Sequence, residues 1–302
     1  MTSRTKKRIG IVGLGNAGSA IATAFSTRGG IAGFDRDADR RAAAVAPNID
    51  IHASLDSLVA VSDVVILSLP HPEISLVVTR DLLAGDRVPA LIIDTSTVTP
   101  QTAIDCAGIA ASCGVGFVDA AIAGGVASMA KGQMTFFMGG DEAAKAMARP
   151  VLEMVAAGIY DLGDIGAGMG IKVVNNAVMH AVMVVLIEAF AMSKKLGVPS
   201  DTLVSILNRE AGLLRPLVHR VAERMKTGDF DGGMSVTNAR KDSCLALVTA
   251  QELGVPLFTI SASHTPYEIA AAKGLGDEDY AALSTLWEEW AQLIFKEAER
   301  RG

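Results

Sequence analysis

The sequence predicts a doubly wound α/β domain with a mostly parallel sheet in residues 1–165, followed by an all-helical domain in residues 166–302. Three observations predict this division. Short apolar runs alternate with helical patterns through the first half, the strand-like runs stop near residue 163, and one long apolar segment follows. Continuous apolar strands separated by helices are typical of a parallel sheet that is covered on both faces.

The strands of the first domain are expected in the apolar runs RIGIV, GIAGF, DVVILSLP, ALIIDTS, GFVDA and MTFFMGG, in that order. Helical patterns separate these runs, and helices are expected at residues 16–27, 37–45 and 141–156. Pro70 bounds one of the two most apolar strands, and Pro89 precedes the other. The first strand, its turn and the following helix therefore belong to a βαβ unit.

The second domain is expected to begin with a helix of about 30 residues, GAGMGIKVVNNAVMHAVMVVLIEAFAMSKKLGV, which Gly197 and Pro199 end. Apolar residues occupy nearly every face, so the helix should be buried along most of its length. His180 and Glu188 interrupt its apolar stretch, which argues against a membrane span. Further helices are expected near residues 201–209, 213–226, 235–253, 264–273 and 277–300.

Composition narrows the class of protein. The chain has 302 residues, half of them hydrophobic, and a formal net charge of -6 without a basic face, which makes nucleic acid an unsuitable partner. The apolar part of the N-terminus is too short for a signal peptide. The cysteines lack CxxC spacing and the histidines lack metal-ligand spacing, so no metal site is expected, and reduced thiols fit a cytoplasmic protein.

A glycine-rich turn follows the first expected strand, where the sequence reads GIVGLGNAG. Between a strand and a helix, Gly13 permits the tight bend, Gly15 lets the backbone approach a pyrophosphate, and Gly18 allows close helix–strand packing. The helix amides from Asn16 onward would face the anion. A purely structural turn is the alternative, but the βαβ context favours a Rossmann-type dinucleotide-binding domain.

An acidic residue, Asp35, ends the second expected strand about 20 residues after Gly13. A carboxylate at this point can accept hydrogen bonds from the ribose hydroxyls and repels a 2′-phosphate, which favours NAD over NADP. Arg36 follows directly and could contact a 2′-phosphate, so NADP stays possible. The alternative for Arg36 is a solvated surface charge.

Lys172 and Asn176 lie four residues apart in the first turns of the long expected helix, so they share one face. Glycines and valines surround Lys172, and partial desolvation would lower its pKa and suit it to proton transfer near neutral pH. The alternative is a lysine that snorkels from a helix end. Late in the chain, Lys241 and Asp242 begin another helical run, where a surface pair is the alternative to a functional one.

Two loops of the first domain carry further candidates. The segment DTSTVTP, Asp94–Pro100, follows a buried strand at the edge where open α/β sheets bind ligands. Its hydroxyl groups at residues 95–97 can bind an anion or the cofactor, or cap the next helix. In AIAGGVASMAKG, the adjacent Gly124 and Gly125 let the backbone approach a small ligand closely.

Taken in order, these segments resemble the β-hydroxyacid dehydrogenase family of the 3-hydroxyisobutyrate dehydrogenase type over essentially the whole chain. GLGNAG is similar to its cofactor loop, DTSTVTP to its DxSTxxP-type segment, and DAAIAGGVASMAKGQMTFFMGG to its substrate-loop block. GAGMGIKVVNN is similar to its G-x-G-x-x-x-K-x-x-x-N signature, and KDSCLAL to its late KD motif. Ordered matches of this kind are far more specific than any single one.

The resemblance implies hydride transfer between NAD(P) and the hydroxyl carbon of a 3-hydroxy acid or its semialdehyde, with Lys172 as acid/base and Asn176 assisting at the substrate. The cofactor-binding residues that it implies are Gly13, Leu14, Gly15, Asn16, Ala17, Gly18, Asp35, Arg36, Leu69, Pro70, Thr97 and Lys241. The substrate-binding residues that it implies are Ala123, Gly124, Gly125, Asn176 and Met234. It also implies a homodimer or homotetramer built from the helical domains.

Three residues depart from the family pattern. Ala123 stands where the family usually has a serine that helps to hold the substrate carboxylate, Ala17 where methionine is common, and Met234 where phenylalanine is frequent. A pocket that is less polar at one wall is therefore expected. An imine reductase, a ketopantoate reductase and a non-catalytic NAD-binding module are the competing interpretations. The retained Lys172 argues against the first, since those enzymes typically lack it.

Overall fold

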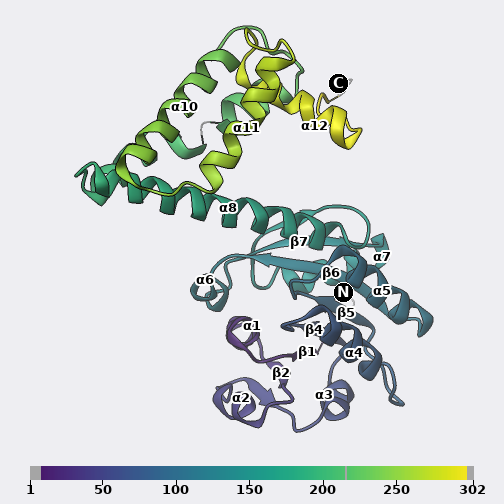
Figure 1. Ribbon diagram of the computed structural model, residues 1–302. Coiled ribbons are helices and arrows are strands. Elements are labelled where there is room, and N and C mark those ends of the chain that lie inside the picture. The colour runs from purple at the N-terminus through teal and green to yellow at the C-terminus, as the bar shows by residue number, and fades with distance from the viewer. Residues whose placement is uncertain (1–7, 215, 298–302) are drawn as a thin grey trace. The chain divides into compact units, whose positions relative to one another are not determined.

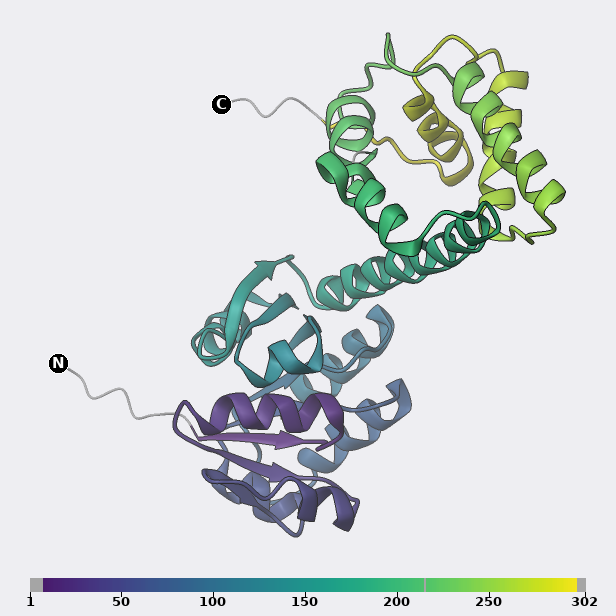
Figure 2. The same ribbon diagram turned by 90° about the vertical axis from the view of Figure 1, so that its left-hand side faces the viewer.

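The computed structural model describes residues 8–214 and 216–297, which form two compact units (Figures 1 and 2). The first unit extends to Ala177 and the second starts at Val178. The boundary expected at residues 165/166 coincides with the end of the strands, whereas the structure divides later, inside the helix α8 (Ala167–Lys195). The first turns of α8, which carry Lys172 and Asn176, therefore belong to the first unit.

The first unit contains a sheet of eight strands with the order β3-β2-β1-β4-β5-β6-β7-β8. Neighbouring strands are parallel except for the antiparallel pair β6 and β7, which confirms a mostly parallel, doubly wound sheet. The strands are β1 (Ile9–Val12), β2 (Ile31–Phe34), β3 (Ile49–Ile51), β4 (Val64–Leu67), β5 (Leu91–Asp94), β6 (Gly116–Ala123), β7 (Met134–Gly140) and β8 (Ala156–Asp161).

The strand order reverses at β1, which pairs with β2 on one side and with β4 on the other. The loops that leave the carboxyl ends of β1 and β4 therefore diverge to opposite faces of the sheet and leave a crevice between them. Ligands of open α/β sheets bind at such a switch point. The glycine-rich turn lies at this place.

Helices cover both faces of the sheet (Figure 2). Those of the first unit are α1 (Asn16–Ser26), α2 (Ala38–Ala43), α3 (Leu55–Val61), α4 (Pro72–Leu82), α5 (Pro100–Ser112), α6 (Val126–Ala130) and α7 (Glu142–Leu152). The helix expected at residues 141–156 was too long, because α7 ends at Leu152 and the chain turns into β8. That strand was not expected, since AAGIYD lies at the sheet edge, lacks fully buried residues and has no apolar run.

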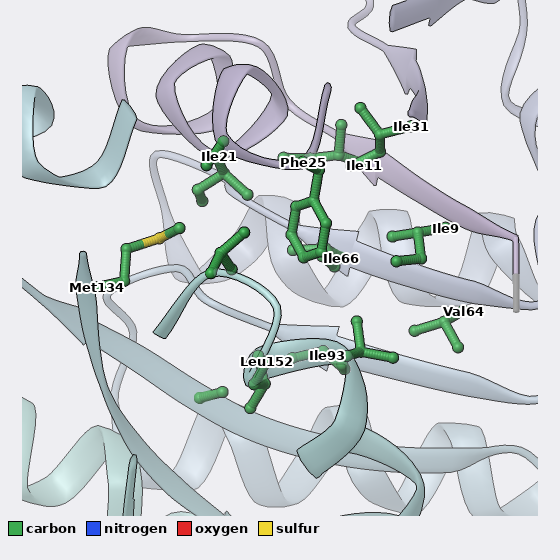
Figure 3. Packing of buried hydrophobic residues seen from close by; sticks show 14 of the residues in the cluster. Ile9, Ile11, Ile21, Phe25, Ile31, Val64, Ile66, Ile93, Met134 and Leu152 are labelled. Carbon is green, nitrogen blue, oxygen red and sulfur yellow. The ribbon is translucent and has the colours of Figure 1, made fainter. Parts of the chain in front are cut away.

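The core of the first unit fixes α1 against the sheet. Phe25 and Ile21 are almost fully buried, and both point from α1 toward the strands that carry Ile11 and Ile66 (Figure 3). Burying one such side chain stabilises the fold by about 1.5–3 kcal/mol. The N-terminus of α1 is thereby held at the end of β1.

The second unit is helical apart from an isolated bridge between Ser235 and Asp279, which confirms the all-helical domain for the described residues. After α8 it contains α9 (Ser200–Asn208), η1 (Arg209–Leu214), η2 (Pro216–Met225), α10 (Val236–Leu253), α11 (Thr259–Ala272), η3 (Tyr280–Leu283) and α12 (Ser284–Ala291). The helix expected at 264–273 starts earlier, and the one expected at 277–300 is broken into η3 and α12. The end of that expected helix lies outside the described residues.

The expectation that α8 is buried along most of its length is wrong for the single chain. In its most apolar window of 18 residues, only 6% are buried, and the mean hydropathy is 1.8. Its exposed large apolar residues in the second unit, between 41% and 56% accessible, are Val178, Met179, Met183, Val184 and Ile187. Within the described residues, α8 is the one helix whose length and composition would allow it to cross a membrane.

One carboxylate on α8 caps another helix of the second unit. Glu188 is 5% exposed and accepts hydrogen bonds from the amides of Phe258 and Thr259 at 2.8 Å and from that of Ile260 at 3.0 Å. These amides belong to the N-terminus of α11, which lacks a side-chain cap of its own. Burial opposes the charge, but the three donors outweigh it, so the pKa of Glu188 lies below its ordinary value.

Replacing Glu188 by Gln is expected to destabilise the second unit by about 1–3 kcal/mol at neutral pH, because an amide satisfies fewer of the three donors. A carboxyl group with a lowered pKa stabilises the fold above its unfolded value of 4.5, and this contribution is lost as the pH falls through the folded value. The difference in the free energy of unfolding between the wild type and Glu188→Gln should therefore become smaller at acidic pH. Urea unfolding followed by tryptophan fluorescence measures it, since both tryptophans, Trp287 and Trp290, lie in this unit. The exposed Glu252→Gln is the matched control.

Candidate active site

The turn after β1 is closed by two glycines. Gly13 has a φ of +96°, its amide donates to the carbonyl of Phe34 at 2.9 Å, and a Cβ there would overlap the carbonyl oxygen of Ser68. A Cβ at Gly18 would overlap the carbonyl oxygen of Gly13. The geometry thus matches the tight bend and the close packing expected of these residues, and it brings α1 directly onto the turn.

Gly15 has a different environment. It precedes α1 without any side-chain cap, so the first helical amides keep their donors for another acceptor. A Cβ built on Gly15 would find Arg40 Nη1 at 3.9 Å as its nearest neighbour. The backbone is therefore open to an approaching anion, and unpaired amides at a helix N-terminus suit a pyrophosphate. These features fit a bound dinucleotide.

A groove of about 500 Å³ runs past this turn. The residues predicted to bind the cofactor that line it are Gly13, Gly15, Asn16, Ala17, Gly18, Asp35, Arg36, Leu69 and Pro70. Ser68, His71 and Arg40 line it as well. Arg40 was missed by the sequence reasoning, because nothing in the pattern of α2 distinguishes it from a surface arginine.

Asp35 is 5% exposed and organises the loop around the groove. Its carboxylate accepts the amide of Leu14 at 2.8 Å and that of Asp37 at 2.9 Å, and Arg40 Nη1 lies 3.7 Å away. Leu14, also predicted to bind the cofactor, does not line the groove, because its side chain packs in the hydrophobic core and its amide is bonded to Asp35. Arg36 is exposed at the groove.

A second cavity of about 240 Å³ contains Lys172. It shares Ala17, Ser68, Leu69 and Pro70 with the dinucleotide groove, so the two adjoin each other in the first unit. Its other lining residues are Ile21, Thr95, Ser96, Thr97, Ile122, Gly124 and Met129. Ile21, Ser68, Ile122 and Met129 were not predicted as site residues, although Ser68 lies in the apolar run DVVILSLP that predicted a strand.

Lys172 is half-buried in this cavity, and burial lowers its pKa from the ordinary value. This agrees with the partial desolvation expected from its neighbours in the sequence. A lysine with a lowered pKa holds a larger neutral fraction near neutral pH and can accept a proton. Asn176 follows one helical turn later and lies outside the residues that line the cavity.

The loops that face Lys172 are tied together by side chains. Thr95 Oγ1 donates to the carbonyl of Leu67 at 2.6 Å, and Ser96 Oγ accepts the amide of Leu69 at 2.9 Å. Thr99, rather than residues 95–97, caps the following helix α5. Thr97 therefore stays exposed at the cavity, as a cofactor contact requires.

The predicted substrate residues are only partly brought together. Gly124, with a φ of +142°, lines the cavity, whereas Gly125 caps α6 and neither it nor Ala123 is part of the lining. Lys241 and Met234 belong to the second unit, and their place at the site stays a prediction. Lys241 is exposed and forms an ion pair with Asp242 at 3.1 Å, as in the surface alternative.

A doubly wound sheet whose dinucleotide groove adjoins the cavity of a half-buried lysine is the architecture of an NAD(P)-dependent oxidoreductase. Residues 8–187 match the family model described as the NAD-binding domain of 6-phosphogluconate dehydrogenase. Residues 166–287 match that described as NAD-binding of NADP-dependent 3-hydroxyisobutyrate dehydrogenase. The chain belongs to the β-hydroxyacid dehydrogenase family, whose enzymes oxidise or reduce hydroxy acids at the hydroxyl carbon with NAD(P).

Named relatives lie in the same family. The 2-(hydroxymethyl)glutarate dehydrogenase of Eubacterium barkeri is 31% identical over 286 residues, which cover 93% of this chain and 95% of the relative. An NAD-dependent L-serine dehydrogenase of Pseudomonas aeruginosa is 29% identical over 300 residues, covering 93% and 98%. The relatives thus extend over both units.

Solved structures agree with the fold. The 3-hydroxyisobutyrate dehydrogenase of Mycobacterium tuberculosis, solved with L-serine, has a TM-score of 0.64 and 32% identity, covering 93% of this chain and 99% of that one. An imine reductase from Pseudomonas sp. has a TM-score of 0.84 at 20% identity, covering 93% and 99%. At that identity the second likeness shows the fold alone.

Proposed function

We propose that this enzyme transfers a hydride between NAD(P) and the hydroxyl carbon of a 3-hydroxy acid or its semialdehyde, with Lys172 as the acid/base. One observation carries the proposal: the cavity of Lys172 adjoins the dinucleotide groove, and Ala17, Ser68, Leu69 and Pro70 line both. When bound, the nicotinamide supplies the hydride acceptor or donor. The first unit is then the cofactor domain.

Lys172 performs the proton transfer in this proposal. In oxidation, its neutral Nζ accepts the proton of the substrate hydroxyl group. In reduction, its ammonium form returns a proton to the developing alkoxide. The burial that lowers the pKa of Lys172 favours the neutral form, and Asn176, on the same helix face, orients the substrate hydroxyl.

The substrate carboxylate is proposed to bind at the backbone of Gly124 and Gly125. Both glycines are exposed, and a Cβ on either would meet no heavy atom within 4 Å, so the space beside them is open to a ligand. Met234, from the second unit, is proposed as an apolar wall of the site. Ala123 supplies no hydroxyl group here, which favours a substrate that needs one polar contact fewer.

Replacing Ala123 by Ser is expected to raise kcat/KM for small 3-hydroxy acids about fivefold, because one hydrogen bond to the carboxylate contributes about 1 kcal/mol. Steady-state kinetics with 3-hydroxyisobutyrate and 3-hydroxypropionate measure the gain. Ala127→Ser, exposed on α6, is the matched control. A gain equal to that of the control would place the carboxylate elsewhere.

NAD is proposed as the preferred cofactor, with NADP accepted less well. The carboxylate of Asp35 lines the groove and disfavours a 2′-phosphate, whereas Arg36 and Arg40 beside it can attract one. Parallel measurements of kcat/KM with the two cofactors decide the preference. A higher value with NADP would contradict it and identify the arginines as the dominant groups.

Absorbance of NADH and NADPH at 340 nm, followed over a panel of 3-hydroxy acids, semialdehydes and cyclic imines, tests the function. Turnover of a 3-hydroxy acid or its semialdehyde supports the proposal. Turnover of imines alone would identify an imine reductase. Cofactor binding without any turnover would leave a non-catalytic NAD-binding module.

A homodimer or homotetramer in the cytoplasm is proposed as the working form. The exposed apolar residues of α8 are unfavourable in water, and an interface with a second copy of the chain would bury them. Lipid suits this helix poorly, because Glu188 lies within it and is held by three amides of α11. Light scattering of the enzyme in detergent-free buffer measures the oligomeric state, and an insoluble or monomeric chain would contradict the proposal.

A further inference from the structure

A buried carboxylate outside the cavity binds the start of α8, the helix that carries Lys172. Asp119 lies on β6 and is fully buried. Its Oδ1 accepts the amide of Gly166 at 2.9 Å, and its Oδ2 accepts the amide of Met169 at 2.7 Å. The donors lie 47 and 50 residues further along the chain. A strand thus supplies the cap of a helix that is distant in sequence.

The amides that Asp119 binds lie at the first turn of α8, where helical N–H groups have no partner within the helix. A carboxylate that accepts two of them fixes both the position and the direction of the helix start. Lys172 follows Met169 by one turn. Because Met169 is fully buried against Val98, Ala103 and Ala121, rotation of this turn is also prevented.

The start of α8 also packs closely against β7. A Cβ on Gly168 would overlap the carbonyl oxygen of Phe137 and come within 2.8 Å of Asp119 Oδ2. A Cβ on Gly139 would come within 2.6 Å of Asp119 Oδ1. Gly168 of the GAGMGIK segment and Gly139 of β7 therefore allow the close contact between Asp119, the strand and the helix start.

We propose that Asp119 is a positioning residue, which fixes the first turn of α8 and thereby the place of Lys172 Nζ in the cavity. The inference rests on the proposed role of Lys172 as acid/base. Positioning of a reacting group matters because a displacement of about 1 Å can lower a rate about 100-fold. Asp119 itself lines neither the dinucleotide groove nor the cavity of Lys172, so it affects the reaction only through the position of α8.

Asp119→Asn tests the proposal, because it keeps the side-chain size and replaces one acceptor by an NH₂ group that faces an amide donor. Hydrogen exchange of the segment 164–172, in the enzyme without cofactor, should become at least about tenfold faster. In assays, kcat should fall about 10- to 100-fold, while the Kd for NADH, measured by fluorescence, stays within about twofold of the wild type. The limb of the pH–rate profile assigned to Lys172 should move to higher pH, since a displaced lysine is better solvated.

Asp141→Asn is the matched control, because Asp141 caps α7 in the same unit and lies away from the cavity. It should change neither the kcat nor the pH profile. An Asp119→Asn variant with unchanged exchange and kcat would overturn the proposal, as would a proportional loss of NADH binding, which indicates general damage. Faster exchange together with a fully active Lys172→Ala variant would instead overturn the proposed function and leave the anchor of α8 in place.

Discussion

Lys172→Ala is expected to lower kcat about 100-fold or more, because general acid–base catalysis contributes factors of this size. Lys172 is the titratable group in the cavity that adjoins the dinucleotide groove, and among residues 8–214 and 216–297 no other lysine, histidine, aspartate or glutamate lines this cavity. Binding of NADH should be retained, since the glycine turn and Asp35 are untouched. Steady-state kinetics and fluorescence titration measure the two effects separately.

Two further variants distinguish lost chemistry from lost packing. Lys172→Met keeps most of the apolar volume but cannot transfer a proton, so its kcat should fall as far as that of Lys172→Ala. Lys195→Ala, at the exposed end of the same helix, should turn over like the wild type. If Lys172→Met retained near-normal turnover, Lys172 would be a packing residue and the acid/base would have to be sought elsewhere.

The pH dependence of oxidation follows from the protonation state of Lys172. Oxidation needs neutral Lys172, so kcat/KM for the hydroxy acid should rise with pH through the pKa of this residue. Because burial lowers that pKa, the midpoint should lie below the ordinary lysine value of 10.5. This rise of kcat/KM with pH should be absent in Lys172→Met.

Local signals in the sequence were sufficient for the glycine turn and its βαβ unit, but not for every strand of the first unit. The spacing of Gly13, Gly18 and Asp35 within a βαβ pattern depends on short-range geometry, and the structure has this geometry. The edge strand β8 left no such signal, because Ala156 and its neighbours are not buried on either face. Strand β3, with three residues, is too short for a periodic pattern.

Long-range contacts explain most of what the sequence did not predict. Asp119 was read only as part of a substrate-loop block, since its partners lie about 50 residues away and no local pattern connects them. The burial of α8 was predicted wrongly because an all-round apolar helix has the same pattern in a core and at an interface between chains. Lys172, Thr97 and Gly124 were predicted from separate motifs, and the fold brings them to one cavity.

Gly15→Ala and Gly18→Ala are expected to fail in different ways, although both residues belong to one turn. At Gly15, φ is -68° and ψ is -169°, which alanine adopts without strain, and its Cβ would project toward the open groove. Folding should be unaffected, whereas the Kd for NADH should rise about tenfold or more, a loss of about 1.4 kcal/mol. The methyl group then occupies the place of the pyrophosphate.

At Gly18 the methyl group would overlap backbone, the carbonyl oxygen of Gly13, which cannot rotate away as a side chain can. Overpacking of this kind costs about 1–3 kcal/mol or more, so Tm should fall by several degrees and NADH affinity should fall with it. Gly108→Ala on α5, where nothing lies within 4 Å of the new Cβ, is the control; it should keep its NADH affinity and should not lower Tm, because alanine is the better helix former. Thermal unfolding with and without NADH distinguishes the effects of the two substitutions. If Gly15→Ala bound NADH normally, the pyrophosphate would not cross the N-terminus of α1. If Gly18→Ala kept its Tm, α1 would not need its close approach to β1.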